Sequence, residues 1–291
     1  MLTRVKRLGS WRGLAWIAVA GALLVVPDGA AAASSFKSVS AGRDHSCAIK
    51  QGGTIVCWGR NNFRQASPPK GEFRSVSGGA YHACAVKRSG KAVCWGRHQF
   101  GQTKPPSGRF DSVEAGYNHT CGVKVNGKVA CWGLGRFGRA TPPPGEFESV
   151  SGGASHTCGV KLGGEIDCWG RNQWGQASPP PGEFASVSAG YFHNCAVRLS
   201  GQLECWGENT YGRASPPEGG FDSVSAGGYN SCGVTLSGEL DCWGYEGEGL
   251  STPPAGQFKS VDTGGNHACG VREGDEIACW GRNNYGQSSP P

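Results

Sequence analysis

The sequence lacks the short motifs that mark the commonest active sites. It has no G-x-x-x-x-G-K-[ST] loop, no Rossmann glycine pattern in a βα context and no G-x-S-x-G at a strand-to-helix turn. It also has no C-x-x-C pair, which is typical of thiol redox catalysts. We therefore expect a protein that is not an enzyme and that needs no cofactor.

Long apolar stretches are also scarce. The one extended run covers residues 13–26, and these 14 residues are fewer than the ~20 that span a bilayer as a helix. Basic residues precede the run, and a short alanine string follows it at residues 30–33. This order is typical of a secretory signal peptide. We predict a signal peptide at residues 1–33, cleaved near residues 31–33, with an uncleaved anchor as the alternative. The protein is then secreted, to the periplasm or the extracellular space, and is not held in a membrane.

The excess of positive charge is small outside this segment. The whole chain has a net charge of +6, but residues 1–33 hold four basic residues and one acidic residue, so residues 34–291 carry +3. Proteins that bind nucleic acid usually present a dense basic stripe. The composition gives no reason to expect nucleic acid as a partner.

Glycine, proline and a strict repeat dominate the rest of the chain. The 50 glycines and 17 prolines exclude a helical repeat, because both residues break helices. A closed ring leaves few exposed edges on short strands. We predict an all-β, seven-bladed β-propeller over residues 34–291, built from seven 37-residue repeats. Each repeat starts at a phenylalanine, and these are Phe36, Phe73, Phe110, Phe147, Phe184, Phe221 and Phe258.

Two cysteines occur in every repeat, ten residues apart. In an exported protein such even usage indicates disulfides, and the turn between each pair predicts facing positions of a β-hairpin. Zinc is disfavoured, since zinc sites usually separate cysteines by two to four residues. We predict one disulfide within each blade: Cys47–Cys57, Cys84–Cys94, Cys121–Cys131, Cys158–Cys168, Cys195–Cys205, Cys232–Cys242 and Cys269–Cys279.

Three strands and a short extended return are expected in each repeat, at residues 36–40, 45–50, 54–58 and 65–69 of the first. Rotational symmetry makes every blade start in the same direction, so the loops after the first and third strands share one face. The hairpin turns and the P-P-x-G links share the other. The repeated Phe and Trp, with Val39 and Ile49 and their equivalents, are expected to pack between blades. Glycines such as Gly42 and Gly59 are expected at turns or close approaches. How the ring closes, with or without exchange of a strand between its ends, stays open.

Twelve aromatic residues lie outside this frame and the predicted signal peptide, and all fall in the two loops of the first face. Tyr, Trp and Arg are enriched at binding hot spots, although the aromatics before Gly-Gln can also brace their own loops. The predicted partner-binding residues of the first loop are Tyr81, Tyr117, Tyr191, Phe192 and Tyr229. Those of the second loop are Phe63, His98, Phe100, Phe137, Arg171, Trp174, Tyr211, Tyr245 and Tyr285.

Histidine occupies one place in six repeats, with Asn230 in the remaining one. Symmetry spreads equivalent residues around a wide circle, whereas metal ligands converge on one ion. We therefore predict no metal site and a structural role, in which each histidine bonds nearby backbone groups at the strand entry. These residues are His45, His82, His119, His156, His193 and His267.

The repeat resembles a known family. Residues 39–48 read V-S-A-G-R-D-H-S-C-A, and residues 57–65 read C-W-G-R-N-N-F-R-Q. These runs are similar to the A-G-x-x-H and W-G-x-N-x-x-G-Q elements of the regulator-of-chromosome-condensation repeat, and the resemblance covers residues 36–291. It implies a seven-bladed propeller but no single function, because that fold hosts exchange factors, chromatin binders and secreted interaction proteins.

The compact repeat and the predicted export resemble secreted bacterial propellers of this family, among them a propeller-type inhibitor of β-lactamases. That resemblance implies inhibition through the aromatics before Gly-Gln, with Trp174, Tyr211 and Tyr285 as counterparts. Arg64 and Glu248 depart from the pattern.

The leading functional hypothesis is an exported, monomeric, non-enzymatic propeller that binds an extracellular or periplasmic protein through its aromatic and arginine-rich loops, as an inhibitor of an exported enzyme would. A lectin-like propeller is one alternative, because aromatic rings beside Asn and Arg also suit glycans. An extracellular structural domain is the other.

Overall fold

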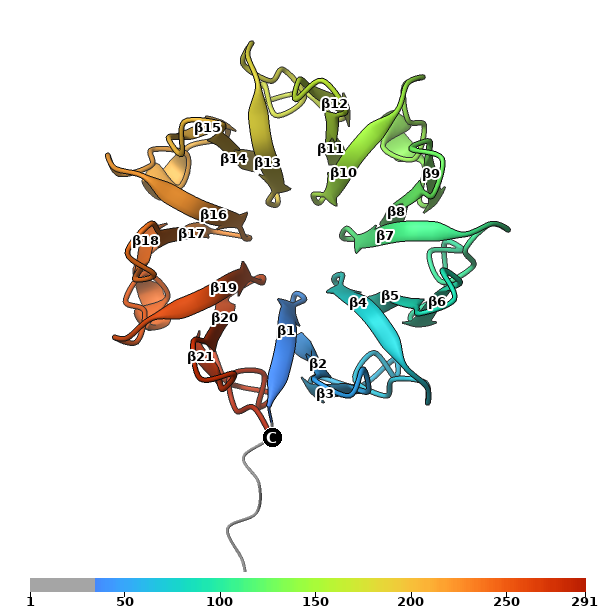
Figure 1. Ribbon diagram of the computed structural model, residues 1–291, viewed down its shortest axis with the longest axis horizontal. Helices are drawn as coiled ribbons and strands as arrows, with labels where there is room; N and C mark the ends of the chain where they lie inside the picture. Colours follow the sequence, from blue (N-terminus) through green and yellow to red (C-terminus); the bar gives the residue numbers. More distant parts are fainter. Residues whose placement is uncertain (1–34) are drawn as a thin grey trace, which may run out of the picture. The chain divides into compact units, whose positions relative to one another are not determined.

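The computed structural model describes residues 35–291, so the predicted signal peptide lies outside the described residues. Within them, seven three-stranded antiparallel sheets form a closed ring, and no α-helix occurs (Figure 1). Each sheet is one repeat, and we number these blades 1 to 7 along the chain. The predicted all-β, seven-bladed propeller is confirmed.

The strands recur at equivalent positions. The first strands are β1 (Phe36–Ala41), β4 (Phe73–Gly78), β7 (Phe110–Ala115), β10 (Phe147–Gly152), β13 (Phe184–Ala189), β16 (Phe221–Ala226) and β19 (Phe258–Thr263). The second strands are β2 (His45–Lys50), β5 (His82–Lys87), β8 (His119–Lys124), β11 (His156–Lys161), β14 (His193–Arg198), β17 (Asn230–Thr235) and β20 (His267–Arg272). The third strands are β3 (Ile55–Gly59), β6 (Ala92–Gly96), β9 (Val129–Gly133), β12 (Ile166–Gly170), β15 (Leu203–Gly207), β18 (Leu240–Gly244) and β21 (Ile277–Gly281). Short 3-10 turns follow three of them: η1 (Arg136–Gly138), η2 (Thr210–Gly212) and η3 (Gly247–Gly249).

The second and third strands place the cysteines face to face. Cys47 of β2 pairs directly with Cys57 of β3, and the same register recurs in every blade. All seven predicted disulfides are present, with Cα atoms 4.0 to 4.1 Å apart. Each disulfide therefore closes one hairpin within its own blade.

The hydrophobic core lies between blades rather than within them. Phe36, Val39 and Trp58 of blade 1 form one cluster with Cys269 and Val271 of blade 7. Five further clusters also join two neighbouring blades. Burying a side chain of this size contributes about 2–3 kcal/mol, so the repeated apolar positions hold the ring together. The predicted packing of Phe and Trp between blades is confirmed.

The expected return at residues 65–69 is not a strand, and the third strand starts and ends one residue later than expected. The return docks on the next blade instead of pairing with its own sheet. The carbonyl of Gln65 accepts a hydrogen bond from Trp95 Nε1 at 2.8 Å, and Pro68 and Pro69 have no N–H for a ladder. Blades therefore have three strands.

The ring closes without exchange of a strand, since β1 pairs with β2 of its own repeat. The contact that links each pair of neighbouring blades also links the last to the first: Trp58 Nε1 donates to the carbonyl of Gln287 at 2.8 Å. Side chains strengthen this junction, because Gln51 donates to the carboxylate of Asp275 at 3.0 Å. Ordinary blade-to-blade contacts thus complete the circle.

Two glycine positions are set by close contact. A Cβ on Gly42 would lie 2.5 Å from the carbonyl oxygen of Gly79 in the next blade, which no side chain tolerates. Gly59 has φ +91°, in the region that favours glycine. Both expectations for these glycines are confirmed.

Candidate functional site

The loops after the first and third strands meet, as predicted, and we call the surface that they form the loop face. Phe63, in the loop after β3, contacts Tyr81, in the loop after β4, with ring centroids 5.7 Å apart. The hairpin turns and P-P-x-G links meet at the other strand ends, where Phe73 N–H donates to the carbonyl of Gly53. The two loop classes therefore belong to one surface.

Most aromatic side chains of the loop face form one continuous cluster. Neighbouring rings are 5.1 to 6.4 Å apart, mainly in edge-to-face or tilted geometry, which is the favoured arrangement. The cluster contains Phe63, Tyr81, Tyr117, Trp174, Tyr191, Phe192, Tyr211, Tyr229 and Tyr245. The structure thus brings together nine of the fourteen predicted binding residues, from blades 1 to 6.

Arginines connect the remaining aromatics to this cluster. Arg97 lies over Phe63 and Phe100, and Arg60 lies over Tyr81 and Tyr285. Arg171 lies over both Phe137 and Trp174, at 5.3 and 5.4 Å from the ring centres. Each such contact contributes about 0.5–1 kcal/mol at exposed sites. His98 is exposed beside Arg97, and its side chain forms no hydrogen bond with any described residue.

The rings differ in how much surface they offer. Tyr117, Tyr191 and Phe192 are half-buried, and burial raises the pKa of Tyr191 above its usual range. Eight others are exposed by 36 to 59%: Phe63, Phe100, Phe137, Trp174, Tyr211, Tyr229, Tyr245 and Tyr285. These eight are all the large aromatic side chains that are exposed in residues 35–291. The surface that can touch a ligand is therefore concentrated on the loop face.

A buried residue two places after each loop aromatic decides how that loop folds. In four blades it is a fully buried glutamine, whose Oε1 accepts the N–H of the aromatic residue at 2.8 to 2.9 Å. In the other three it is Arg139, Arg213 or Leu250, and the loop forms a 3-10 turn. The residue in the aromatic place then has a left-handed φ: +65° at Phe137 and Tyr211.

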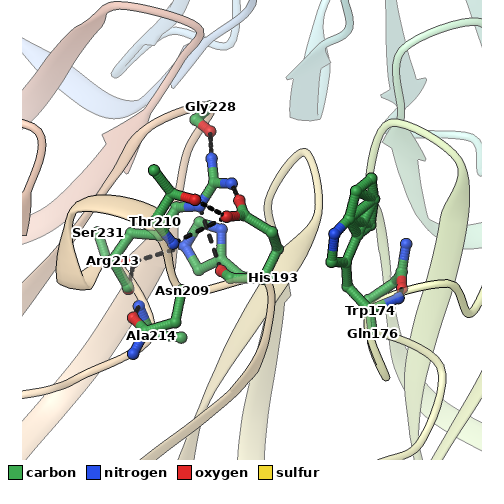
Figure 2. A network of polar contacts seen from close by, with 10 residues as sticks. Trp174, Gln176, His193, Asn209, Thr210, Arg213, Ala214, Gly228 and Ser231 are labelled. Atoms are coloured by element: carbon green, nitrogen blue, oxygen red, sulfur yellow. Dashed lines mark hydrogen bonds and ion pairs between the residues drawn. The ribbon is translucent and has the colours of Figure 1, made fainter.

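The two buried arginines have different surroundings. Arg213 donates to the carbonyl of Gly228 at 2.7 Å (Figure 2). It also pairs with the carboxylate of Glu208. Arg139 donates to the equivalent carbonyl, that of Ala154, at 2.7 Å but forms no salt bridge with any described residue. The place of Glu208 in that repeat is taken by Leu134. Burial, together with the positive charges of Arg136 and Arg171, lowers the pKa of Arg139.

The histidines are structural, but their predicted hydrogen-bond partners were wrong. His193 Nε2 contacts Ser231 Oγ of the next blade at 2.8 Å, and that hydroxyl donates to the carbonyl of Arg213 (Figure 2). Five of the six histidines bond a side chain of the neighbouring blade in this way, rather than the backbone. The reason is that each of these histidine side chains points across the interface to the neighbouring blade, where a side chain and not a backbone group meets its Nε2 atom. Burial lowers the pKa of these rings to about 3 or 4, so they are neutral.

Sequence reasoning missed two carboxylates on the first strands of blades 3 and 7. In five repeats a serine follows the valine of the first strand, and its hydroxyl accepts a hydrogen bond from a backbone N–H of the next blade. Ser77 Oγ, for example, accepts from the N–H of Ala115 at 2.9 Å. Glu114 and Asp262 take this place in the other two. Burial, and then the charge of Asp262, raise the pKa of Glu114 to about 8. Alignment of the repeats reveals the two exceptions, but not their mutual proximity.

Four exposed aliphatic residues on the opposite surface were also missed. They follow the second strands of blades 3 to 6 and are 55 to 72% exposed: Val125, Leu162, Leu199 and Leu236. Within residues 35–291, no three side chains of His, Cys, Asp or Glu come together as metal ligands, and no helix is long and apolar enough to cross a membrane. The loop face thus remains the candidate site with the most side chains in mutual contact.

Solved structures similar to this chain are propellers. The CRINKLY WD40 ectodomain of the receptor kinase ACR4 from Arabidopsis thaliana is 25% identical, with a TM-score of 0.72 over 85% of this chain and 96% of that one. Prp20p from Saccharomyces cerevisiae, described with its binding properties to Gsp1p and histones, is 15% identical, with a TM-score of 0.70 over 87% and 83% of the two chains. No curated protein sequence matches.

A family model matches in every blade. The Regulator of chromosome condensation (RCC1) repeat is found at residues 36–65, 73–102, 110–139, 147–176, 184–213, 221–249 and 258–287. These matches cover most of the chain and coincide with the observed sheets. The chain therefore belongs to the RCC1 repeat family.

Proposed function

We propose that this protein is an exported, non-enzymatic binding protein that holds a protein ligand on its loop face. The observation that carries the proposal is the gathering of all eight exposed large aromatics of the described residues on that surface. Aromatic and arginine side chains dominate binding hot spots, and here arginines hold the rings in place before any ligand arrives. Such preorganisation reduces the entropy lost on binding.

Export is supported by the disulfides. Seven disulfides with no free cysteine in residues 35–291 fit an oxidising compartment. The similar ACR4 propeller is an ectodomain, and Prp20p is described as binding other proteins. Residues 1–33 supply the signal peptide in this proposal. Mass spectrometry of the protein from the extracellular or periplasmic fraction should find a new N-terminus near residues 31–33.

The test compares two triple variants as baits. Trp174→Ala, Tyr211→Ala and Tyr285→Ala remove three exposed rings from the loop face. The matched control changes Leu162, Leu199 and Leu236 to serine on the opposite surface, where all three are exposed. Affinity capture from the native extracellular or periplasmic fraction should recover a protein with the wild type and the control. The loop-face variant should lose at least 100-fold in affinity for it, because single hot-spot rings contribute about 2 kcal/mol or more.

Two further experiments test enzyme inhibition and glycan binding separately. Purified exported enzymes, β-lactamases among them, are assayed with the propeller to test inhibition. A glycan array tests the lectin-like alternative, since repeated sugar sites bind multivalent glycans tightly. Glycan binding that depends on the same three rings, or an unchanged protein affinity in the loop-face variant, overturns the proposal.

A further inference from the structure

A cavity on the loop face has unbalanced positive charge. It has a volume of about 560 Å³ and is lined mainly by loops of blades 3, 4 and 5, with Arg43, Tyr229 and Asn266 from blades 1, 6 and 7. Its lining includes Arg43, Arg136, Arg139 and Arg171, together with aromatic rings. Among the described residues, no aspartate or glutamate lines it. The cavity therefore combines several cations with aromatic rings and neutral polar side chains.

Three of these arginines are not neutralised by the protein itself. Arg43 contacts the carboxylate of Asp44 at 3.6 Å, but Arg136, Arg139 and Arg171 form no salt bridge with any residue in 35–291. Arg139 is only 4% exposed, and its two hydrogen bonds go to the carbonyls of Arg136 and Ala154. A buried charge without a counter-charge costs free energy unless a ligand provides one.

Blade 5 shows the same arrangement with its counter-charge in place. Arg213 bonds the carbonyl of Gly228 as Arg139 bonds that of Ala154, and the remaining guanidinium edge pairs with Glu208. Leu134 replaces that glutamate in blade 3. The fold thus has a place for a carboxylate beside this arginine, which blade 5 fills from its own chain and blade 3 leaves open to the cavity.

We propose that the cavity of blade 3 binds an aspartate or glutamate side chain of the protein ligand, in the place that Glu208 occupies in blade 5. Arg139 supplies a planar edge for the carboxylate, and Arg136 and Arg171 add positive charge around it. Phe137 and Tyr191 line the same cavity and lower the local polarity around the pair, which strengthens it. This proposal rests on the proposed function and specifies its ligand as a protein with an acidic loop.

The first test uses a short probe, so that it does not depend on the native partner. An acetylated and amidated Gly-Asp-Glu-Asp-Gly peptide is titrated into the full chain, and the Nε–H signals of the arginines are followed by NMR. We expect the signals of Arg136, Arg139 and Arg171 to shift, with affinity that falls as salt is raised. A peptide with Asn and Gln in place of the acids should leave them unchanged. Equal shifts with both peptides, or shifts with inorganic phosphate alone, overturn the proposal.

Variants copied from other blades supply the controls. Leu134→Glu provides an internal carboxylate as in blade 5, and Arg139→Gln installs the residue of blades 1, 2, 4 and 7, so both should fold. We expect each variant to lower the affinity for the acidic peptide at least 10-fold. Arg282→Gln removes the same charge from the loop face outside the cavity and should bind as the wild type does. Wild-type affinity in the Leu134→Glu variant contradicts the assignment.

Capture of the native partner separates this proposal from the broader one. If the Leu134→Glu variant retains the partner at full affinity while the aromatic triple variant loses it, the loop face binds protein but the acidic contact is wrong. In the other outcome, the acidic peptide binds in the cavity while neither the Leu134→Glu variant nor the aromatic triple variant changes the affinity for a captured partner. The cavity then binds anions, but both the proposed function and its acidic contact are wrong.

Discussion

The backbone N–H of Trp174 donates a hydrogen bond to Oε1 of the buried Gln176, with 2.8 Å between nitrogen and oxygen. This contact keeps the φ of Trp174 out of the left-handed region. At Tyr211, where Arg213 takes the place of the glutamine, φ is +65°. A buried polar residue thus sets the direction in which an exposed ring is presented. The loop face owes part of its shape to buried residues beneath the exposed rings.

Replacement of Gln176 by leucine should therefore change the loop of blade 4. Leucine already occupies the equivalent place at Leu250, so the side chain fits. We expect Trp174 to adopt a left-handed φ and the free energy of unfolding to fall by about 1–2 kcal/mol, since a buried N–H loses its acceptor and the backbone becomes strained. A crystal structure and denaturant titration check both effects. The reverse change, Leu250→Gln, should bring Glu248 out of its left-handed φ. If the loop backbone is unchanged in both variants, the buried residue does not set the conformation of the loop.

The carboxyl group of Glu114 should make stability depend on pH. Its pKa rises from 4.5 to about 8 on folding, so the folded protein holds a proton that the unfolded chain releases between these values. The contribution of Glu114 to stability is therefore present below about pH 4.5 and is lost as pH rises through 8. Relative to the wild type, Glu114→Gln should gain about 1–2 kcal/mol between pH 5 and 9, after a discount for the partial exposure of the side chain. Thermal unfolding at several pH values measures the gain, and Glu146→Gln, an exposed change, should show none.

The buried histidines should have the opposite dependence. Burial lowers the pKa of His45 from 6.5 to about 4, so the unfolded chain binds a proton first as pH falls. Its contribution to stability is complete above pH 6.5 and is lost as pH falls through 4. His45 faces Ala83 in the next blade, just as Asn230 faces Ala268, so His45→Asn copies an existing pair. We expect the variant to match the wild type within about 1 kcal/mol at pH 7 and to be about 2 kcal/mol more stable, relative to it, at pH 4. Urea titrations at both pH values measure the free energy of unfolding, and the exposed change His98→Asn is the control.

Each disulfide should contribute moderately to stability. The loop that Cys158 and Cys168 close is short, and the hairpin already holds its ends together, so the chain-entropy estimate of somewhat under 3 kcal/mol is an upper bound. Replacement of both cysteines by alanine should lower the free energy of unfolding by about 1–2 kcal/mol and leave the ring intact. Guanidinium titration and circular dichroism provide the measurements. Loss of the folded state in this one double variant would show that the hairpins depend on their disulfides far more than the packing implies.

Much of the fold follows from the sequence because the repeat is strict. The spacing of Phe36 and its equivalents predicts seven identical units, and Cys47 with Cys57 predicts the hairpin register. The return at residues 65–69 was not predictable in the same way. Its backbone groups bond the next blade, and a pattern within one repeat does not reveal a contact that forms only when two repeats pack.

For the candidate site, too, some features follow from the sequence and others require the structure. That Tyr81, Trp174 and Tyr211 belong to one surface follows from the parity of strand direction, which any sequence of this period must obey. The partners of these rings depend on distances between blades. The different surroundings of Arg139 and Arg213 arise within their own loops, where Glu208 of blade 5 is replaced by Leu134 in blade 3. Side chains as far apart along the chain as Arg43 and Tyr117 meet only because the ring brings the loops together near its axis.

The sequence by itself determined the architecture, since covalent spacing and hydrophobic repetition are properties of the chain. Only the tertiary structure decided which charges are compensated. Ring closure brings Glu114 of blade 3 near Asp262 of blade 7, and the fold of the loop after β15 brings Glu208 onto Arg213. Electrostatic free energy depends on distance and on burial, and both are set by the packing of one blade against the next.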